Sequence, residues 1–323
     1  MPRSIQQLAN RLTFRQLQVF LAVFEQHGFS KAGELLGLTQ PAVSSQIRQL
    51  EEALGQPLFE YIGRKLYPTL AAETLAKSVG VIFDELRFVQ TDIATRSGKV
   101  AGELRLAGVN TAQYVVPYLL HGFLQQYPDV KASVRVVNRA EAINRLQDNS
   151  DDLTIMGMVP DDKPFASLPF LDNELVPILP ANHPLLLQKK ISLQDFLEAG
   201  LLIREAGSGS RLALELHCQQ QRLQLSPVMQ LGSNDTVKHA VLAGLGVAVL
   251  PKLSVLSELA LGRLAIAQIA GFPLRRSWCV VYPKAKNPTP AMKAFIDYMQ
   301  KNIKYFNKEF FESRILTNMT EVK

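Results

Sequence analysis

The chain has 323 residues, of which 47% are hydrophobic, and this length suggests two or three domains with substantial cores. Its two cysteines, Cys218 and Cys279, are too few for a disulfide framework and indicate a reducing compartment. We find neither the apolar core of a signal peptide near the start nor an apolar run of the roughly 20 residues that cross a membrane. We therefore expect a cytoplasmic protein without membrane contact. The formal net charge of +6 permits binding to nucleic acid but does not by itself indicate it.

Residues 30–54 have the pattern of two helices joined by a tight turn, with an amphipathic stretch at 14–24 that predicts a third helix packed across them. Ser30 is placed to cap a helix over residues 31–36, and Gly37 can adopt the left-handed conformation that ends it. Thr39 is placed to cap the second helix. The apolar spacing predicts inward faces of Ala32, Leu35 and Leu36 on the first helix and of Val43, Ile47, Leu50 and Leu54 on the second.

The opposite face of the second helix carries polar side chains, and a short extended pair with a basic turn follows it. Polar groups near a helix N-terminus suit base edges in the major groove, and a basic wing suits the phosphate backbone. The candidate DNA-contacting residues are Gln40, Pro41, Ser44, Ser45, Arg48, Arg64 and Lys65. A helical bundle with a solvated polar face has the same pattern, and residues 1–68 hold seven Lys or Arg against five Asp or Glu, a net charge of only +2.

Residues 69–97 predict a long helix of about 40 Å with a narrow apolar seam. The seam residues, spaced alternately by three and four, are Leu75, Val79, Ile82, Leu86, Val89 and Ile93. A narrow seam favours one helical partner, so we interpret this segment as a linker that dimerises the chain. Packing of the seam against its own domain is the alternative. Residues 97–102 are the expected hinge to the next domain.

Residues 98–300 predict an α/β domain, because strands and helices alternate as βαβαβ, which is typical of a parallel sheet covered by helices. We expect strands at 103–109, 130–137, 153–158, 175–179, 200–204, 247–250 and 276–282. Helices are expected at 116–124, 140–146, 193–198, 211–220, 235–243 and 289–302. The domain divides into one lobe of about 102–162 with 272–300 and a second of about 163–271, and 301–323 forms a tail. Such two-lobed domains, also found in periplasmic binding proteins, hold ligands in the cleft between the lobes.

Three loops follow predicted strands and open helices, where free N–H groups and the helix dipole favour an anion. They contain Asn110-Thr111, Gly207-Ser208-Gly209-Ser210 and Ser233-Asn234. Arg139, Arg204 and Arg211 have forked side chains that suit carboxylate or phosphate. Each loop alone can be an ordinary helix cap, and the GSGS segment lacks the lysine of a P-loop. Together on one scaffold, however, the loops predict a ligand cleft.

An enzyme is not expected. The five histidines lack metal-binding spacing, Ser208 lacks the setting of a hydrolase nucleophile, and we predict no metal site and no catalytic residue. The acidic pairs Asp151-Asp152 and Asp161-Asp162 are most simply solvated.

The stretches LTFRQLQVFLAVFEQHGFSKA, TQPAVSSQIRQLEEALGQPLFE and GRKLYPT resemble the winged helix-turn-helix of LysR-type transcriptional regulators, over residues 12–73. The segments TAQYVVP, VVNR, DLTIMG, REAGSGSR and LGSNDTVKHAVLAGLGVAVLP resemble the effector domain of the CbbR branch of that family, whose members control carbon-fixation genes.

The resemblance implies an α/β protein with three parts: an all-α winged helix-turn-helix at 1–68, a linker helix and an effector domain. Such regulators bind promoter DNA as a dimer of dimers, act on RNA polymerase and carry no cofactor. Their effectors are small anions such as sugar phosphates, phosphoglycolate, 2-oxoglutarate or reduced pyridine nucleotides. The cleft residues carried over from the family are Asn110, Thr111, Asn138, Arg139, Arg204, Ser208, Ser210, Arg211 and Asn234.

The chain also departs from the CbbR pattern. Met158-Val159 stands where an Arg-Pro pair is frequent, at the end of the third predicted strand, and this leaves the identity of the effector open. A LysR-type regulator of another pathway, such as nitrogen assimilation, is the alternative interpretation. A small-molecule binding protein without a regulatory role is a more distant one.

Overall fold

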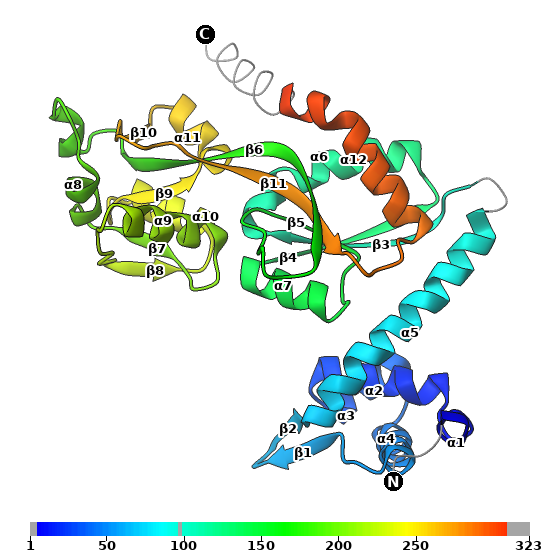
Figure 1. Ribbon diagram of the computed structural model, residues 1–323. Coiled ribbons are helices and arrows are strands. Elements are labelled where there is room, and N and C mark those ends of the chain that lie inside the picture. The colour runs from blue at the N-terminus through cyan, green and yellow to red at the C-terminus, as the bar shows by residue number, and fades with distance from the viewer. Residues whose placement is uncertain (1–4, 96–98, 309–323) are drawn as a thin grey trace. The chain divides into compact units, whose positions relative to one another are not determined.

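The computed structural model describes residues 5–95 and 99–308, and the chain divides into two compact units after Arg87 (Figure 1). Residues 97–98 of the expected hinge at 97–102 and residues 309–323 of the expected tail lie outside the described residues. Within the described ranges, no helix has the length and apolar character needed to span a membrane.

The first unit contains the predicted helix-turn-helix. Its elements are α1 (Ile5–Ala9), α2 (Phe14–Gln26), α3 (Phe29–Leu36), α4 (Gln40–Leu54), β1 (Phe59–Ile62), β2 (Lys65–Pro68) and the start of α5 (Leu70–Thr95). Gly37 has a φ of 65° and ends α3, and the Thr39 hydroxyl accepts a hydrogen bond from the Ala42 N–H, so both predicted caps of the turn are confirmed. Val43, Ile47 and Leu50 are buried, as their spacing predicted.

Two details of α3 were predicted wrongly. The helix begins one residue before Ser30, at Phe29, and its N-cap is Gly28, so Ser30 lies inside the first turn. Leu35 is 61% exposed instead of facing inward. Ala32 and Gly33 are both buried, so the buried face is centred between these two positions and Leu35 falls on the flank of the helix.

The predicted wing is also present. Strands β1 and β2 pair antiparallel, and the turn between them contains Gly63, with a φ of 64°, and Arg64. The long helix α5 follows directly. Val79 is fully buried in the core of the first unit, whereas the seam from Ile82 to Ile93 is exposed. The start of the seam therefore packs on its own unit, which was the alternative interpretation, and the later part remains open for another helix.

The second unit is built on one mixed sheet in the order β10-β6-β11-β5-β3-β4, with β9 beside β6. The strands of the first lobe are β3 (Gly102–Val109), β4 (Val130–Val137) and β5 (Leu153–Met156). Its helices are η1 (Asn110–Tyr114), α6 (Val116–Gln126), α7 (Arg139–Gln147) and α12 (Pro290–Lys308). Strand β3 pairs parallel with β4 and β5, which confirms the predicted βαβαβ arrangement.

Two long antiparallel strands, β6 (Phe165–Pro180) and β11 (Leu274–Pro283), run from one lobe to the other (Figure 1). Only residues 175–179 of β6 were predicted as a strand, because Pro169 and Asp172 interrupt the apolar pattern. Phe165 and Phe170 pack in the core of the first lobe, so the start of the second lobe at 163 was placed too early. Likewise, α12 continues beyond residue 302 and buries Phe306 in the same core. The expected tail from 301 is therefore helical up to Lys308.

The second lobe consists of short strands and helices. Its strands are β7 (Leu202–Arg204), β8 (Met229–Leu231), β9 (Ala248–Pro251) and β10 (Leu264–Ile266). Its helices are η2 (Pro184–Leu187), α8 (Leu193–Glu198), α9 (Gly209–Gln220), α10 (Asn234–Leu242), η3 (Lys252–Ser254) and α11 (Leu256–Ala260). Strands β9 and β10 extend the main sheet through β6, and β7 pairs parallel with β8. The first turns of α9 and α10 thereby lie at the carboxyl ends of their preceding strands.

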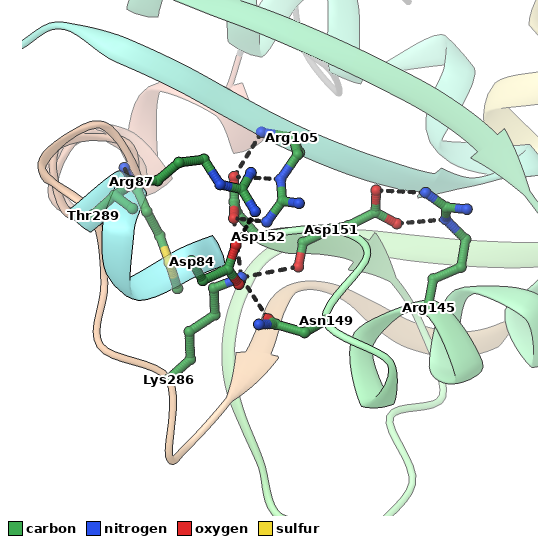
Figure 2. A network of polar contacts seen from close by, with 10 residues as sticks. Asp84, Arg87, Arg105, Arg145, Asn149, Asp151, Asp152, Lys286 and Thr289 are labelled. Carbon is green, nitrogen blue, oxygen red and sulfur yellow. Dashed lines mark hydrogen bonds and ion pairs between the residues drawn. The ribbon is translucent and has the colours of Figure 1, made fainter. Parts of the chain in front are cut away.

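A buried polar network ties the first lobe together (Figure 2). Asp152 accepts hydrogen bonds from the Arg105 backbone N–H at 2.9 Å and from Arg105 Nη2 at 2.7 Å, and Lys286 Nζ lies 3.0 Å from its Oδ1. Arg145 binds both carboxylate oxygens of Asp151. Both aspartates are only 3% exposed, so the expectation that this pair is solvated was wrong. Burial alone raises the pKa of Asp152, but Arg105 and Lys286 outweigh it and lower the pKa to about 2.

Candidate functional site

The seven candidate DNA-contacting residues lie around two adjoining grooves of the first unit. Gln40, Pro41, Ser44, Ser45 and Arg48 line the groove between α4 and β1, and Arg64 and Lys65 line a second groove with Gln40. Six of the seven are exposed, and Ser44 is half-buried. The second groove also contains His27, Ser30 and Lys31, which sequence reasoning missed. Their proximity depends on how α3 packs against the wing, which no local pattern specifies.

Arg48 is available for a partner outside the protein. Its guanidinium lies 3.3 Å from Glu52, but the two side chains are 82% and 67% exposed. An exposed i,i+4 pair of this kind contributes only about 0.3–0.5 kcal/mol. A phosphate or a base edge can therefore replace Glu52 at little cost.

The second unit has a cavity between its lobes that brings together seven of the nine predicted effector residues. The predicted residues that line it are Asn110, Thr111, Asn138, Arg139, Arg204, Ser208 and Ser210. Met158, whose departure from the CbbR pattern left the identity of the effector open, also lines it, and sequence reasoning missed Asn173, Arg276 and Trp278. The cavity encloses about 30 Å³, room for about one or two water molecules. A larger ligand therefore enters only when the lobes or their side chains move apart.

The lining of this cavity is cationic. It contains the three arginines Arg139, Arg204 and Arg276 and no aspartate or glutamate. Arg139 Nε donates to the Met158 carbonyl at 2.6 Å, and burial lowers the pKa of its guanidinium. Met158 itself has a φ of 54°, a left-handed conformation that is uncommon for a residue other than glycine. Arg139 and Arg276, which form no ion pair at contact distance with any described residue, favour a ligand with negative charge.

Arg204 has a different role from the one its sequence position suggested. Its side chain is 4% exposed, and its Nε and Nη2 bind the two carboxylate oxygens of Glu205 at 2.7 and 2.9 Å. Its Nη1 donates to Asn234 Oδ1. The fork expected to bind a ligand is thus occupied by a neighbouring carboxylate, and Arg204 holds Asn234 in place. The buried Asn234 Nδ2 has no hydrogen-bond partner among the described residues.

The first turn of α9 is open toward the cavity. The N-cap side chains Thr13, Thr39, Asn138, Ser192 and Ser233 each accept a hydrogen bond from their own helix. Ser208 is the N-cap of α9 and makes no such bond, although it is only 4% exposed. The Leu212 N–H donates to the Ser208 carbonyl, but no side chain caps the N–H groups before it in this turn. Uncapped N–H groups of this kind are the arrangement that binds anions at helix N-termini.

The two lobes touch each other around the cavity. The Ala140 N–H donates to the Gly207 carbonyl at 3.2 Å, and the Asn234 N–H donates to Asn110 Oδ1 at 3.2 Å. Gly207 has a φ of 86°, and a Cβ added there would lie 2.9 Å from the Ala140 Cβ, so this approach requires glycine. The structure therefore joins the first turn of α7 to the loop before α9.

Arg211 lies outside the cavity, contrary to what the carried-over pattern implied. Its Nε binds Glu215 at 2.6 Å, and its Nη1 donates to Gln230 and to the Arg204 carbonyl. The Glu215 partner at i+4 was a readable sequence signal for this direction. Asn234 also stands behind the lining, held by Arg204. The described part of the chain contains no group of three metal-ligating side chains.

Comparisons with known proteins agree with this architecture. Residues 14–73 match the bacterial regulatory helix-turn-helix proteins of the lysR family, and residues 97–304 match the LysR substrate binding domain. The RuBisCO operon transcriptional regulator of Acidithiobacillus ferrooxidans is 41% identical over 89% of this chain and 93% of its own length. The transcriptional activator CmpR of Synechocystis is 40% identical over 89% of this chain and 94% of its own length.

Solved structures give the same result. The regulatory domain of Synechocystis CcmR, in complex with 2-phosphoglycolate, has a TM-score of 0.59 and 35% identity. The match covers 63% of this chain and 98% of that one. CbnR, a LysR family transcriptional regulator, has a TM-score of 0.64 and 20% identity and shares the fold over 90% of this chain and 99% of its own. The CbnR match covers both the helix-turn-helix and the two-lobed domain of this chain. The chain belongs to the LysR family of bacterial transcriptional regulators and is not an enzyme.

Proposed function

We propose that this protein controls carbon-fixation or inorganic-carbon genes in response to a small phosphorylated acid, of which 2-phosphoglycolate is the first candidate. The cationic cavity, with three arginines, no acidic lining residue and the uncapped first turn of α9, carries the proposal. The named roles of the relatives, a RuBisCO operon regulator and CmpR, support the choice of genes. The 2-phosphoglycolate complex of the CcmR domain supports the choice of effector.

In this proposal the first unit reads the promoter. The N-terminal part of α4 enters the major groove, where Gln40, Ser44, Ser45 and Arg48 contact bases and Pro41 lies at the helix start. Arg64 and Lys65 of the wing hold phosphates. The exposure of these side chains around two adjoining grooves supports the assignment.

The linker helix pairs two chains. From Ile82 to Ile93 its seam is exposed, with Leu86 at 44% and Val89 at 50%. Pairing along this seam gives two reading heads, and a dimer of dimers gives four. Closure of the lobes on the effector then changes how subunits pack, and with it the bending of DNA and the access of RNA polymerase.

Two measurements on the full-length protein test the proposal. Calorimetric titration compares 2-phosphoglycolate with 2-oxoglutarate and glycolate, and we expect 2-phosphoglycolate to bind most tightly. Fluorescence anisotropy compares duplex DNA from upstream of the RuBisCO and carbon-uptake genes with shuffled DNA at moderate salt. Equal affinity for both duplexes, with and without the acid, contradicts the proposed role in transcription. Absence of heat with all three acids contradicts the proposed effector class.

A further inference from the structure

Arg276 and Trp278 are two cavity residues that come from the same strand, β11. They are two positions apart, and alternate residues of a strand share a face. Trp278 is 1% exposed, and its indole N–H has no acceptor among the residues that the structure describes. A buried donor without an acceptor is costly, so native proteins almost always provide a partner. The unpaired indole N–H therefore indicates that a ligand supplies the acceptor.

Arg276 has one weak hydrogen-bond partner and one backbone partner. Its Nε faces the Met158 thioether sulfur at 3.2 Å, and its Nη1 donates to the Arg275 carbonyl at 2.8 Å. A thioether is a poor acceptor compared with an anionic oxygen. Neither Arg276 nor Arg139 is paired with a carboxylate in the described part of the chain, in contrast to Arg204. Met158 thus lies between two guanidinium groups that form no ion pair at contact distance with any described residue, although the more distant Asp162 acts to raise the pKa of Arg139.

The first turn of α9 forms a separate part of the cavity wall. The closest approach of Gly209 to the first lobe is to the side-chain stem of Arg139, since a Cβ added to Gly209 would lie 3.5 Å from Arg139 Cδ. Ser208 and Ser210 flank this glycine, and both are buried. Several backbone N–H groups and hydroxyls at a helix start suit the three oxygens of a phosphate. A guanidinium fork suits the plane of a carboxylate.

We infer that the cavity has two anion subsites, and that Arg276 and Trp278 form the one that binds the carboxylate of a phosphorylated acid whose phosphate lies at the first turn of α9. The inference rests on the proposed effector class and names the residues that select for a second anionic group. When the Arg276 fork turns to this carboxylate, Nε gives up a thioether contact and Nη1 exchanges the Arg275 carbonyl for a charged acceptor.

The test is a calorimetric titration of the full-length protein with 2-phosphoglycolate and with methyl phosphate, which lacks the carboxylate. The variants are Arg276→Met and, as a matched control, Arg275→Met. Arg275 is the neighbouring residue on β11, its side chain is 80% exposed, and it pairs with Glu174 outside the cavity. Arg276→Met should weaken 2-phosphoglycolate binding about tenfold to hundredfold, the usual range for a hydrogen bond to a charged group. In the same variant, the Kd of methyl phosphate should change less than about threefold. In Arg275→Met, the Kd of each probe should also change less than about threefold.

A second pair of measurements covers the case in which Arg276→Met does not fold, as judged by its thermal unfolding. Arg276→Lys keeps the charge but loses the fork, and should lie between the wild type and the methionine variant for 2-phosphoglycolate. Trp278 is the single tryptophan of the chain, so its fluorescence reports this subsite directly. In the wild type, 2-phosphoglycolate should shift the emission, and saturating methyl phosphate should leave it unchanged.

The outcomes separate the two claims. Suppose that the wild type binds both probes. If Arg276→Met then weakens the binding of both probes equally, or of neither, the carboxylate subsite is wrong and the proposed effector class stands. An equal emission change with both probes has the same meaning. If the wild type binds neither probe, the proposed effector class fails, and the subsite fails with it.

Discussion

The hydroxyl of Tyr114 donates a 2.9 Å hydrogen bond to Asp235 Oδ1 and joins the first lobe to the second. Gln113 Nε2 donates to Asp235 Oδ2 at 3.1 Å, and Lys238 Nζ lies 3.3 Å from Asp235 Oδ1. Burial and the Asp235 bond raise the pKa of Tyr114, so the phenol keeps its proton and remains a donor. Asp235 is the second residue of α10 and follows Asn234, whose backbone N–H bonds to Asn110 of the cavity wall, so this contact lies near the effector cavity and favours the closed lobes.

We predict that Tyr114→Phe weakens binding of the effector. The lost bond is charge-assisted but Asp235 is 46% exposed, so we expect a loss of about 1 kcal/mol, or about fivefold in Kd. Calorimetric titration with 2-phosphoglycolate measures it, and Tyr118→Phe on α6 is the control, since that ring is half exposed. An unchanged Kd for Tyr114→Phe means that this contact does not hold the lobes together.

Arg48→Ala should weaken binding to a specific promoter duplex by about 1–3 kcal/mol if Arg48 reads a base. The matched control is Arg15→Ala, an exposed arginine on α2 outside both grooves. Fluorescence anisotropy with specific and shuffled duplexes measures the effect. A loss that is equal on both duplexes assigns Arg48 to phosphate, and no loss removes it from the interface.

The wing residues should affect how strongly DNA binding depends on salt concentration. Arg64→Ala and Lys65→Ala should each reduce the slope of log affinity against log salt by about one and weaken all duplexes alike. Titrations at several salt concentrations provide the slope. If the slope is unchanged in both variants, the wing does not contact the DNA backbone.

The exposed seam of α5 predicts the assembly state. Leu86→Glu places a charge in the seam and should convert the oligomer to smaller species, because a buried unpaired carboxylate is costly. Val81→Glu is the control, since Val81 is 53% exposed on the same helix but outside the seam. Light scattering after gel filtration measures the mass. Equal masses for Leu86→Glu and the wild type contradict the linker interface.

Asp152 predicts a pH dependence of stability. Its pKa is lowered from 3.8 to about 2 in the folded protein, so its contribution is complete above pH 4 and is lost as the pH falls through about 2. A shift of this size corresponds to about 2 kcal/mol. Asp152→Asn should therefore destabilise the protein at pH 7, with a difference from wild type that shrinks below pH 4. Urea denaturation at several pH values measures this, and Asp161→Asn, at an exposed position, should have little effect.

The sequence alone determined the parts of this protein that depend on local chemistry. The caps at Gly37 and Thr39, the wing turn at Arg64, the helix over 70–95 and the parallel βαβαβ order all follow from residue spacing and turn preferences within short windows. The loop before α9 was also readable, because glycines and serines at a helix start have a definite use. For the same reason, seven of the nine proposed effector residues reached one cavity.

Tertiary structure decided what the local pattern could not. Arg276 and Trp278 come from a strand more than 100 residues beyond Arg139. They reach the same cavity because the paired strands β6 and β11 pass from one lobe to the other. The distant partners of the arginine side chains were likewise decided by the fold. Gln230 holds Arg211 outside the cavity together with the local Glu215, and the Met158 sulfur faces Arg276 Nε. A spacing rule identifies a residue that is able to bind an anion, but only the folded chain shows which guanidinium groups still lack one.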